Sequence, residues 1–575
     1  MASKYRDSFD FMAALPAATR KVVLAAARHL VLPAGTVLFR QGDKADALYL
    51  LRSGTLGVYV ERHGVQALVA LIRPGEIIGE MAVAARTGRS ATVSAIRDCQ
   101  LLRLTPTAFR RLAKKHSSIH AALVQVLAHR LRRTTSGEPP VIEPRVTAFL
   151  AASRDVDPEA FARALARHMQ AQGYGVHVVA PGDLARTKQT VAELEARYDH
   201  LFLCGCDDEE CNRLCIRQSD RLVALARAES SPGRGVPREL FDQRTDHQLA
   251  DLVILHDWPH RNPTHTARWL DALRANRHFH LRHSEAADWQ RLARVIAGRS
   301  VGLVLSGGGA RAYAHLGVMR ALDEAAIPID FIGGASMGGI VAACIAMDWP
   351  IAESVERIRR AFVDHNPLSD YSLPLFGLIK GKWVERLLKE NFGTTLISDL
   401  WRPFFCVSSN LTTAEVEVHR RGRVAEVLRA SVALPGILPP VSTRAGVLVD
   451  GGVMDNLPVD VMRSINNGPV IAVDVARDLA ITPKWLAKMR SASFISRLLR
   501  PPLISILMRA GTVANEFENR QQLANADLAI IPRLGEIDIR NWMVFEKTMD
   551  LGYRAAREAL ETAEARALFR NPRGQ

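Results

Sequence analysis

The stretch from Val301 to Gly339 reads VGLVLSGGGARAYAHLGVMRALDEAAIPIDFIGGASMGG. Two apolar runs, residues 301–305 and 329–332, each lead into a glycine-rich turn followed by a helical pattern. Two strand–turn–helix junctions about 30 residues apart are typical of one βαβ unit. The first turn is expected to present backbone N–H groups and the second a serine. The stretch therefore predicts an α/β domain with a reactive site.

The second turn, residues 334–338, has the pattern G-x-S-x-G. Gly334 and Gly338 would flank Ser336 because a tight strand-to-helix turn leaves no room for side chains beside a nucleophile. The helix that follows would favour negative charge developing at the serine. Isolated matches to this pattern also arise by chance or as structural turns. Whether Ser336 is a nucleophile therefore depends on whether the chain supplies a base to activate it.

An ordinary hydrolase triad would need a histidine late in the chain. Only His365 and His419 follow Ser336, and the last 150 or so residues contain no histidine. An acidic residue at a special turn is available instead, because the apolar run 445–449 ends in Asp450-Gly451-Gly452. A carboxylate is a weak base for a serine unless burial raises its pKa, so Asp450 would need a partly desolvated pocket.

These residues resemble the patatin-like phospholipase family, which carries a G-G-G-x-R/K loop, G-x-S-x-G and D-G-G in this order. The resemblance covers the last half of the chain and includes residues 430–440, ASVALPGILPP. It implies acyl transfer by a dyad without histidine, with Ser336 as nucleophile and Asp450 as base. It implies an oxyanion hole formed by Gly307, Gly308, Gly309 and Arg311. The family loop usually continues with glycine after the basic residue, whereas this chain has Ala312.

Residues 1–140 carry short alternating apolar runs separated by glycine turns, followed by a helical pattern from Pro106 to about Arg133. This pattern is typical of a β jelly-roll or barrel with trailing helices. Residues 78–83 (IGEMAV) and 89–93 (RSATV) resemble the phosphate-binding cassette of cyclic nucleotide-binding domains. The alternative is a degenerate domain that keeps the fold without the ligand.

The cassette resemblance implies a site made of Gly79, Glu80, Arg89 and Ser90, with cAMP or cGMP as an allosteric ligand. Glu80 would accept a hydrogen bond from the ribose, and Arg89 would pair with the phosphate as a bidentate fork. Family members commonly have proline before the arginine, where this chain has Gly88. A linker, residues 134–140, follows in place of a helix-turn-helix, so we expect no nucleic-acid partner.

Residues 141–298 alternate apolar strand-like and helical segments, which indicates an α/β, Rossmann-like middle domain. The segment after its first run, AASRDVDPEAF, lacks the glycines and lysine of a phosphate loop, so an inert spacer or docking domain is expected. Four cysteines (Cys204, Cys206, Cys211 and Cys215) suit a buried strand and one helix face better than a metal site. Six histidines crowd the end of this segment, and we expect them to form a solvated, polar connector: His256, His260, His265, His278, His280 and His283.

The chain has 575 residues, a formal net charge of +15 and seven cysteines, and it contains no apolar run long enough to cross a membrane. The charge favours anionic partners, although a generally arginine-rich proteome explains it equally well. We expect a cytoplasmic protein with peripheral contact at the inner membrane surface. Two apolar, arginine- or lysine-containing stretches, 494–509 and 376–388, could lie in a lipid interface or pack near an acyl pocket.

The sequence thus predicts a multidomain protein with a β jelly-roll (1–140), an α/β middle domain (141–298) and a C-terminal α/β patatin-like domain (299–575). The combination resembles bacterial relatives of neuropathy target esterase. It implies hydrolysis of fatty acyl esters in phospholipids or lysophospholipids, using no metal or other catalytic cofactor. Regulation of the hydrolase by cyclic nucleotide is a hypothesis that rests only on the fusion of the two domains. The alternatives are a nucleotide-responsive scaffold and a membrane-recruitment protein, each with a silent hydrolase domain. Oligomeric state is not predicted.

Overall fold

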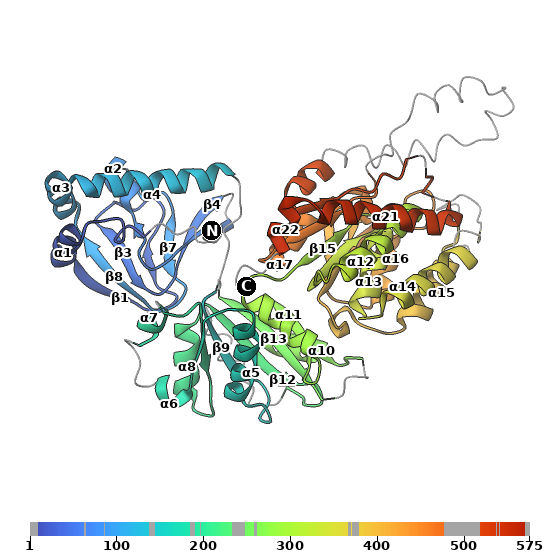
Figure 1. Ribbon diagram of the computed structural model, residues 1–575, viewed down its shortest axis with the longest axis horizontal. Coiled ribbons are helices and arrows are strands. Elements are labelled where there is room, and N and C mark those ends of the chain that lie inside the picture. Colours follow the sequence, from blue (N-terminus) through green and yellow to red (C-terminus); the bar gives the residue numbers. More distant parts are fainter. Residues whose placement is uncertain are drawn as a thin grey trace, which may run out of the picture. The chain divides into compact units, whose positions relative to one another are not determined.

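A computed structural model of the chain is shown in Figure 1. It describes residues 10–62, 65–85, 87–136, 144–184, 190–195, 197–232, 248–257, 262–365, 370, 379–476, 518–535, 537–539 and 541–569. The chain forms two compact units, one comprising Met1–Val253 with Ala272–Asn276 and the other Ile254–Asp271 with Arg277–Gln575. None of the helices in the described ranges is long and apolar enough to cross a bilayer.

The N-terminal part is a sandwich of two four-stranded antiparallel sheets, ordered β1-β8-β3-β6 and β2-β7-β4-β5. The strands are β1 (Arg28–Leu32), β2 (Val37–Phe39), β3 (Leu48–Ser53), β4 (Leu56–Arg62), β5 (Val65–Ile72), β6 (Ile77–Ile78), β7 (Thr92–Ala95) and β8 (Cys99–Leu104). The helices are α1 (Ala17–Ala26), α2 (Glu80–Ala85), α3 (Pro106–Lys115) and α4 (Ser117–Ser136). The predicted β jelly-roll with flanking helices is confirmed.

Alternation along β3 and β8 explains how this sandwich is covered. Leu48 and Leu50 belong to a core cluster with residues of α1, α3 and α4, whereas Tyr49 and Leu51 belong to a second cluster with residues of the opposite sheet. Successive side chains of a strand point to opposite faces, so one strand supplies both cores. The helices therefore close the outer face of one sheet, as Figure 1 shows for α4.

The middle part is a six-stranded sheet with the order β10-β11-β9-β12-β13-β14. Its strands are β9 (Val146–Ala151), β10 (Val176–Val179), β11 (His200–Cys204), β12 (Arg221–Arg227), β13 (Leu249–His256) and β14 (Arg277–Arg282). Its helices are α5 (Pro158–Ala171), α6 (Pro181–Leu184), α7 (Thr190–Glu195), α8 (Glu209–Gln218), α10 (Thr266–Leu273) and α11 (Ala286–Ile296). The pairs β10/β11, β11/β9 and β9/β12 are parallel, which confirms the α/β prediction.

The N-terminal end of α5 follows the first strand of this sheet, where a nucleotide-hydrolysing fold would carry its phosphate loop. The Asp157 carboxylate accepts hydrogen bonds from the N–H groups of Glu159 and Ala160 at 2.9 and 3.1 Å. Free N–H groups at such a helix end are what a phosphate would bind. In this chain an acidic side chain already uses them.

The interpretation of the middle-domain histidines as a solvated connector is wrong for His256 and His280. They lie in β13 and β14 and are buried, with 6% and 3% of their surfaces exposed. His256 Nε2 lies 2.9 Å from His280 Nδ1, and His280 Nε2 lies 2.9 Å from the carbonyl oxygen of Ser398. Burial lowers the pKa of His256 to about 4 and that of His280 well below its usual value. Both are neutral core residues, while His260 lies outside the described residues.

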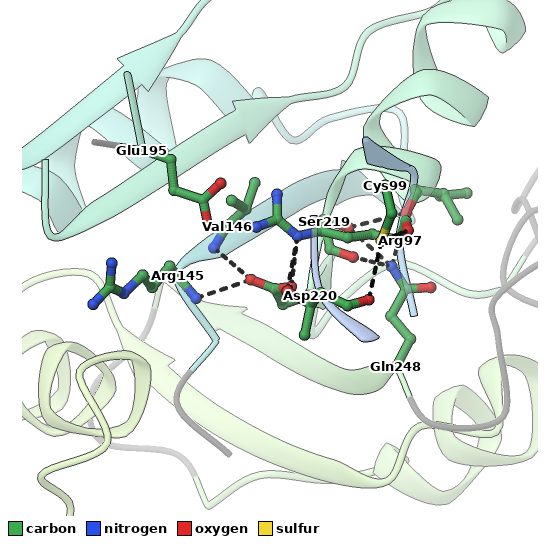
Figure 2. Close-up of polar contacts among 10 residues, drawn as sticks. Arg97, Cys99, Arg145, Val146, Glu195, Ser219, Asp220 and Gln248 are labelled. Carbon is green, nitrogen blue, oxygen red and sulfur yellow. Dashed lines mark hydrogen bonds and ion pairs between the residues drawn. The ribbon is translucent and has the colours of Figure 1, made fainter. Parts of the chain in front are cut away.

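A buried ion cluster joins the turn after β7 to the amino ends of β9 and β12 (Figure 2). The Arg97 guanidinium pairs with Glu195, and its Nε lies 2.8 Å from Asp220 Oδ1. Asp220 also accepts hydrogen bonds from the Thr55 hydroxyl at 2.7 Å and from the Val146 N–H at 3.1 Å. Burial opposes the charge of Asp220, yet Arg97 and these hydrogen bonds hold its pKa below the ordinary value. The jelly-roll and the middle sheet therefore share a buried, charged junction.

The C-terminal part is built on a mixed sheet with the order β19-β20-β17-β16-β15-β21-β22, and β18 also pairs with β17. Its strands are β15 (Gly302–Leu305), β16 (Phe331–Ala335), β17 (Phe404–Asn410), β18 (Glu415–His419), β19 (Val441–Thr443), β20 (Gly446–Asp450), β21 (Val470–Val473) and β22 (Leu528–Ile530). Its helices are α12 (Tyr313–Glu324), α13 (Ser336–Ala346), α14 (Ile351–Arg359), α15 (Lys382–Phe392), α16 (Val424–Ser431), α17 (Val459–Ile465), α21 (Phe545–Leu560) and α22 (Ala563–Phe569). The predicted C-terminal α/β domain is confirmed.

The strands β17, β16, β15, β21 and β22 are parallel neighbours, whereas β20 runs antiparallel to β17. Helices α12 and α21 pack together through glycines: a Cβ atom on Gly317 would lie 1.9 Å from the Met549 carbonyl oxygen. A Cβ atom on Gly552 would lie 2.0 Å from the Ala314 carbonyl oxygen. This close approach holds α12, which follows the glycine loop, in a fixed position over the sheet.

Candidate active site

Ser336 stands at the sharp junction between β16 and α13. Its φ is 51°, in the left-handed region that residues other than glycine rarely adopt. A Cβ atom on Gly334 would lie 2.3 Å from the Leu305 carbonyl oxygen, and one on Gly338 would lie 2.4 Å from the same atom. Both glycines are therefore required by the contact with β15. The turn leaves Ser336 half-buried among buried neighbours, at the N-terminal end of a helix.

The Ser336 hydroxyl donates a hydrogen bond of 2.7 Å to Asp450 Oδ2. Asp450 ends β20, and its other oxygen accepts a hydrogen bond of 2.8 Å from the Gly452 N–H. Only 4% of Asp450 is exposed. Burial raises its pKa to about 6, although the hydrogen bonds from Ser336 and Gly452 oppose the shift. The structure thus brings together a serine and a desolvated carboxylate that is still ionised at neutral pH.

The two histidines after Ser336 have other partners. His419 Nε2 lies 2.7 Å from the Ser408 hydroxyl, and His365 Nδ1 lies 2.7 Å from the Arg360 carbonyl oxygen. The earlier His315 is fully buried, and its Nε2 lies 2.8 Å from the Ser306 carbonyl oxygen. His315 therefore contacts the residue before the glycine loop, not just its helix neighbours.

The glycine loop runs from Gly307 into a short 3₁₀ turn, η1 (Gly309–Ala312). The Gly307 N–H donates to Asn456 Oδ1 at 3.1 Å, and Asn456 Nδ2 donates to the Gly307 carbonyl oxygen at 3.3 Å. No described residue accepts a hydrogen bond from the N–H of Gly308 or Gly309. These two N–H groups are consequently the ones in the loop available to an oxyanion, while Gly307 is held by Asn456.

The Arg311 side chain is 2% exposed and binds backbone carbonyls of the C-terminal segment. Its Nε donates to Ile537 at 2.9 Å, and its terminal nitrogens donate to Gly535 at 2.5 Å and Val475 at 3.3 Å. The Ala310 N–H also donates to the Ile539 carbonyl oxygen at 2.7 Å. Arg311 and Ala310 therefore anchor the glycine loop to Gly535, Ile537 and Ile539.

Two further residues, Ala312 and Ser431, lie next to the glycine loop and to Ser336. Ala312 has ordinary helical angles and a buried methyl group within the main core cluster, so the loop accommodates it. The Ser431 hydroxyl accepts a hydrogen bond of 3.0 Å from the Ser336 N–H and donates one of 2.7 Å to the Val407 carbonyl oxygen. Ser431 thereby fixes the backbone of Ser336. The sequence analysis assigned no role to Ser431 or Asn456, although Ser431 lies within the quoted stretch 430–440 and Asn456 follows Asp450-Gly451-Gly452 by four positions.

A small apolar cavity of about 30 Å³ is lined by residues of α13, α14 and α15. Ile340, one turn after Ser336, and Phe362 line it, together with Val384, Leu387 and Leu388 of α15. Of the stretch 376–388, residues 376–378 lie outside the described part of the chain. Over the rest, the buried face of α15 favours packing near the site, while Trp383 is exposed. Residues 494–509 lie outside the described part of the chain.

The candidate nucleotide cassette lies between β6 and β7, and α2 begins at Glu80. Gly79 has a φ of 80°, and a Cβ atom there would lie 2.2 Å from an Arg89 terminal nitrogen. Arg89 is 2% exposed, donates to the Ala47 carbonyl oxygen at 2.8 Å and to Asp46 at 3.0 Å, and lies over the Phe39 ring. Gly79 thus makes room for Arg89, while Ser90 is exposed.

Two buried polar atoms in this cassette lack partners among the described residues: Arg89 Nε and Glu80 Oε2. The other oxygen of Glu80 pairs with Arg130 of α4. A nucleotide phosphate needs a donor and a ribose hydroxyl needs an acceptor. The residues present therefore fit a cyclic nucleotide.

Comparisons with known proteins match three successive parts of the chain. Family models match residues 29–116 (cyclic nucleotide-binding domain), 145–297 (Neuropathy Target Esterase family P-loop like domain) and 303–463 (patatin-like phospholipase). An uncharacterized NTE family protein of Mycobacterium tuberculosis is 32% identical over 563 residues, covering 93% of this chain and 92% of its own length. Patatin-like phospholipase domain-containing protein 6 of Homo sapiens is 28% identical over 559 residues, covering 84% of this chain and 40% of its own length. Lysophospholipase nte1 of Aspergillus fumigatus is 27% identical over 635 residues, covering 92% of this chain and 41% of its own length.

Proposed function

The chain belongs to the NTE family, and from that premise we propose that it is a lipid hydrolase that cleaves fatty acyl esters of phospholipids or lysophospholipids. The observation that carries the proposal is the 2.7 Å hydrogen bond from the Ser336 hydroxyl to the buried Asp450 carboxylate. Such a pair provides a nucleophile and its base without a histidine. The patatin-like domain and the lysophospholipase among the relatives support an ester of a lipid as substrate.

In the proposed mechanism Ser336 Oγ attacks the ester carbonyl carbon while Asp450 takes the hydroxyl proton. The N–H groups of Gly308 and Gly309 then donate to the oxyanion, since no described residue uses them. Collapse of the tetrahedral intermediate releases the alcohol, which takes the proton back from Asp450. Water activated by Asp450 hydrolyses the acyl-enzyme, so the same carboxylate serves both halves of the reaction.

The proposed function is tested by fatty acid release from a panel of phospholipids and lysophospholipids. Wild-type protein and Ser336→Ala are compared with Ser442→Ala, which removes an exposed hydroxyl on β19. We expect turnover by the wild type and Ser442→Ala and essentially none by Ser336→Ala. Release by Ser336→Ala at the wild-type rate would contradict the assignment, and no release from any lipid by the wild type would favour the silent-domain alternative.

We also propose that cAMP or cGMP binds the jelly-roll and changes the rate of hydrolysis. The unpartnered Arg89 Nε and Glu80 Oε2 support binding. Calorimetry should show binding to wild type and none to Arg89→Ala. Arg103→Ala is the matched control, because Arg103 pairs with the same Asp46 yet lies on β8, outside the cassette. Hydrolysis rates that stay constant despite measured binding would refute regulation, since a regulator must bind two states unequally.

We further propose that the protein works in the cytoplasm and contacts membrane surfaces from there. All seven cysteines are free thiols, which supports a reducing compartment. The formal charge of +15 supports attraction to anionic lipid head groups. Sedimentation with vesicles containing phosphatidylserine should be strong at low salt and weak at high salt. Absence of sedimentation at low salt would contradict the proposed contact with anionic membrane surfaces.

A further inference from the structure

Three exposed apolar side chains lie at the edge of the C-terminal sheet that carries Ser336. Within the described residues of that unit, the exposed large apolar side chains are Trp383 (38% exposed), Leu411 (54%), Val418 (37%) and Met543 (77%). Val418 lies within β18, whereas the other three lie in segments that contact the candidate active site. Single exposed apolar side chains are common on protein surfaces. Three of them at one edge of one sheet need an explanation.

Leu411 is the first residue after β17, in the turn between β17 and β18. In the pair formed by β17 and β20, Ser408 lies opposite Asp450, and the Leu411 N–H donates a hydrogen bond of 2.9 Å to the Val447 carbonyl oxygen. β16 and β17 are parallel, and Ser336 follows the last residue of β16. Leu411 therefore lies beyond Ser336 and Asp450, at the carboxyl edge of the sheet.

Met543 lies in the 3₁₀ turn η5 (Trp542–Val544), which is joined to the glycine loop by two contacts. The Ala310 N–H donates a hydrogen bond of 2.7 Å to the Ile539 carbonyl oxygen. The Trp542 ring packs edge-on against Tyr313, with the ring centroids 6.0 Å apart, and Tyr313 is the first residue after the loop. Met543 is therefore at the same edge of the sheet as the glycine loop.

Trp383 lies in the first turn of α15, close to the segment that connects α16 to β19. The Ile379 N–H donates a hydrogen bond of 3.1 Å to the Ile437 carbonyl oxygen. The Ala433 carbonyl oxygen accepts one of 3.0 Å from the Asp450 N–H. Residues 433–437 therefore contact both the proposed base and the chain that leads into Trp383.

Exposed cations accompany these three side chains, and they are Lys380, Lys382, Arg444 and Lys547. Asn410 Nδ2 donates a hydrogen bond of 2.9 Å to the Ala445 carbonyl oxygen, which places the turn at Arg444 beside Leu411. None of the ion pairs between described residues uses any of the four cations. By contrast, Arg423, which follows β18, pairs with Glu426 at 3.0 Å. The exposed Glu546 partly offsets Lys547, so the positive excess is greatest around Trp383.

We propose that Trp383, Leu411 and Met543 form a docking rim that inserts into the head-group region of an anionic lipid bilayer. The partner rests on the proposed lipid hydrolase, whose substrate lies in such a bilayer. Tryptophan and cation-flanked apolar side chains are typical of the boundary between lipid and water. A protein partner would instead require one contiguous apolar patch. Docking would present Ser336 to the surface, so that a lipid need not expose its whole acyl chain to water.

The first test measures sedimentation of full-length Ser336→Ala protein with mixed phosphatidylcholine–phosphatidylserine vesicles, which this variant should leave intact. Trp383→Asp, Leu411→Asp and Met543→Asp, each added to that parent, should weaken vesicle affinity at least about 10-fold. The matched control is Val124→Asp, which adds the same charge at an exposed apolar position on α4 and should bind like the parent.

The cations are tested in the same parent by neutral substitutions. Lys382→Gln should weaken binding to the anionic vesicles about 5-fold at low salt, because a lysine near an anionic surface contributes attraction of that size. Arg423→Gln is the control, because this arginine already has a carboxylate partner, and it should bind like the parent. Equal binding by Lys382→Gln and the parent would contradict the anionic character of the partner.

A second measurement does not depend on a disruptive variant. The chain has eight tryptophans. The fluorescence quenched by brominated phosphatidylcholine in the parent, but not in Trp383→Phe, therefore reports on Trp383 alone. We expect Trp383→Phe to bind vesicles and to lose most of the quenching. The same quenching with and without Trp383 would overturn the proposal, as would parent-like binding by any of the three aspartate variants, an equal loss in Val124→Asp, or no binding by the parent.

The docking rim and the hydrolase can fail separately. Fatty acid release by the wild type tests the hydrolase, whereas every docking measurement uses protein that lacks the nucleophile. Vesicle binding through the rim without any fatty acid release would leave docking in place and refute the hydrolase. Release of fatty acid without rim-dependent binding would do the reverse.

Discussion

Replacing Asp450 by asparagine is expected to remove activity while stabilising the fold, because the same burial that makes Asp450 a stronger base makes its charge costly. Its pKa rises from the ordinary 3.8 to about 6. Each pKa unit corresponds to about 1.4 kcal/mol, so the ionised carboxylate costs up to about 3 kcal/mol. Asparagine can accept from the Gly452 N–H and donate to Ser336 Oγ, which keeps both contacts satisfied. Loss of the base should lower kcat about 10³-fold.

The sign of the stability change depends on pH. The folded pKa of Asp450 lies above its unfolded value, so the cost is absent below about pH 4 and complete above about pH 6. Urea unfolding of wild type and Asp450→Asn at pH 5 and pH 8 should show a larger gain for the variant at pH 8. A variant equally or less stable than wild type at pH 8 would refute the desolvation argument. A variant with wild-type kcat would refute the role of Asp450 as base.

Two further substitutions test the surroundings. Asn456→Ala removes both side-chain hydrogen bonds to Gly307, so the glycine loop should lose its alignment. We expect kcat to fall about 10-fold with little change in the free energy of unfolding. An unchanged kcat would show that the contact between Asn456 and Gly307 is not needed for catalysis. Arg97→Met leaves Glu195 and Asp220 buried without their cation and should cost about 3 kcal/mol in urea unfolding. The control Arg217→Met breaks the more exposed pair with Asp98 and should cost less than about 1 kcal/mol, so equal losses would contradict the account.

Much of the fold followed from local patterns in the sequence. A Cβ atom on Gly334 or Gly338 would lie only 2.3 to 2.4 Å from the Leu305 carbonyl oxygen, so the turn requires glycine at both positions and the sequence shows it as G-x-S-x-G. The alternation in β3 and β8 and the apolar runs of β9 and β11 likewise follow from which faces they bury. The pairing of Ser336 with Asp450 could not be predicted from a local pattern, because the two residues are far apart in the sequence. It was the family resemblance that predicted it.

Side-chain directions were not predictable in the same way. The family resemblance implied a place for Arg311 in the oxyanion hole, whereas its guanidinium binds carbonyl groups more than 160 residues later in the chain. Asn456 holds Gly307 across 149 positions, so no local pattern reveals it. His256 and His280 were misassigned because a polar side chain suggests solvent. Their mutual hydrogen bond and the contact with Ser398 satisfy them inside the core.

The central claim is that the buried Asp450 carboxylate activates Ser336. The most direct measurement is the pH dependence of labelling by an uncharged fluorophosphonate, with the adduct located by mass spectrometry. The account predicts an adduct on Ser336 whose rate of formation rises through about pH 6 and then levels off, following the raised pKa of Asp450. Asp450→Asn should label about 10³-fold more slowly with no step in this range. An adduct on another residue, or labelling of Asp450→Asn at the wild-type rate, would contradict it.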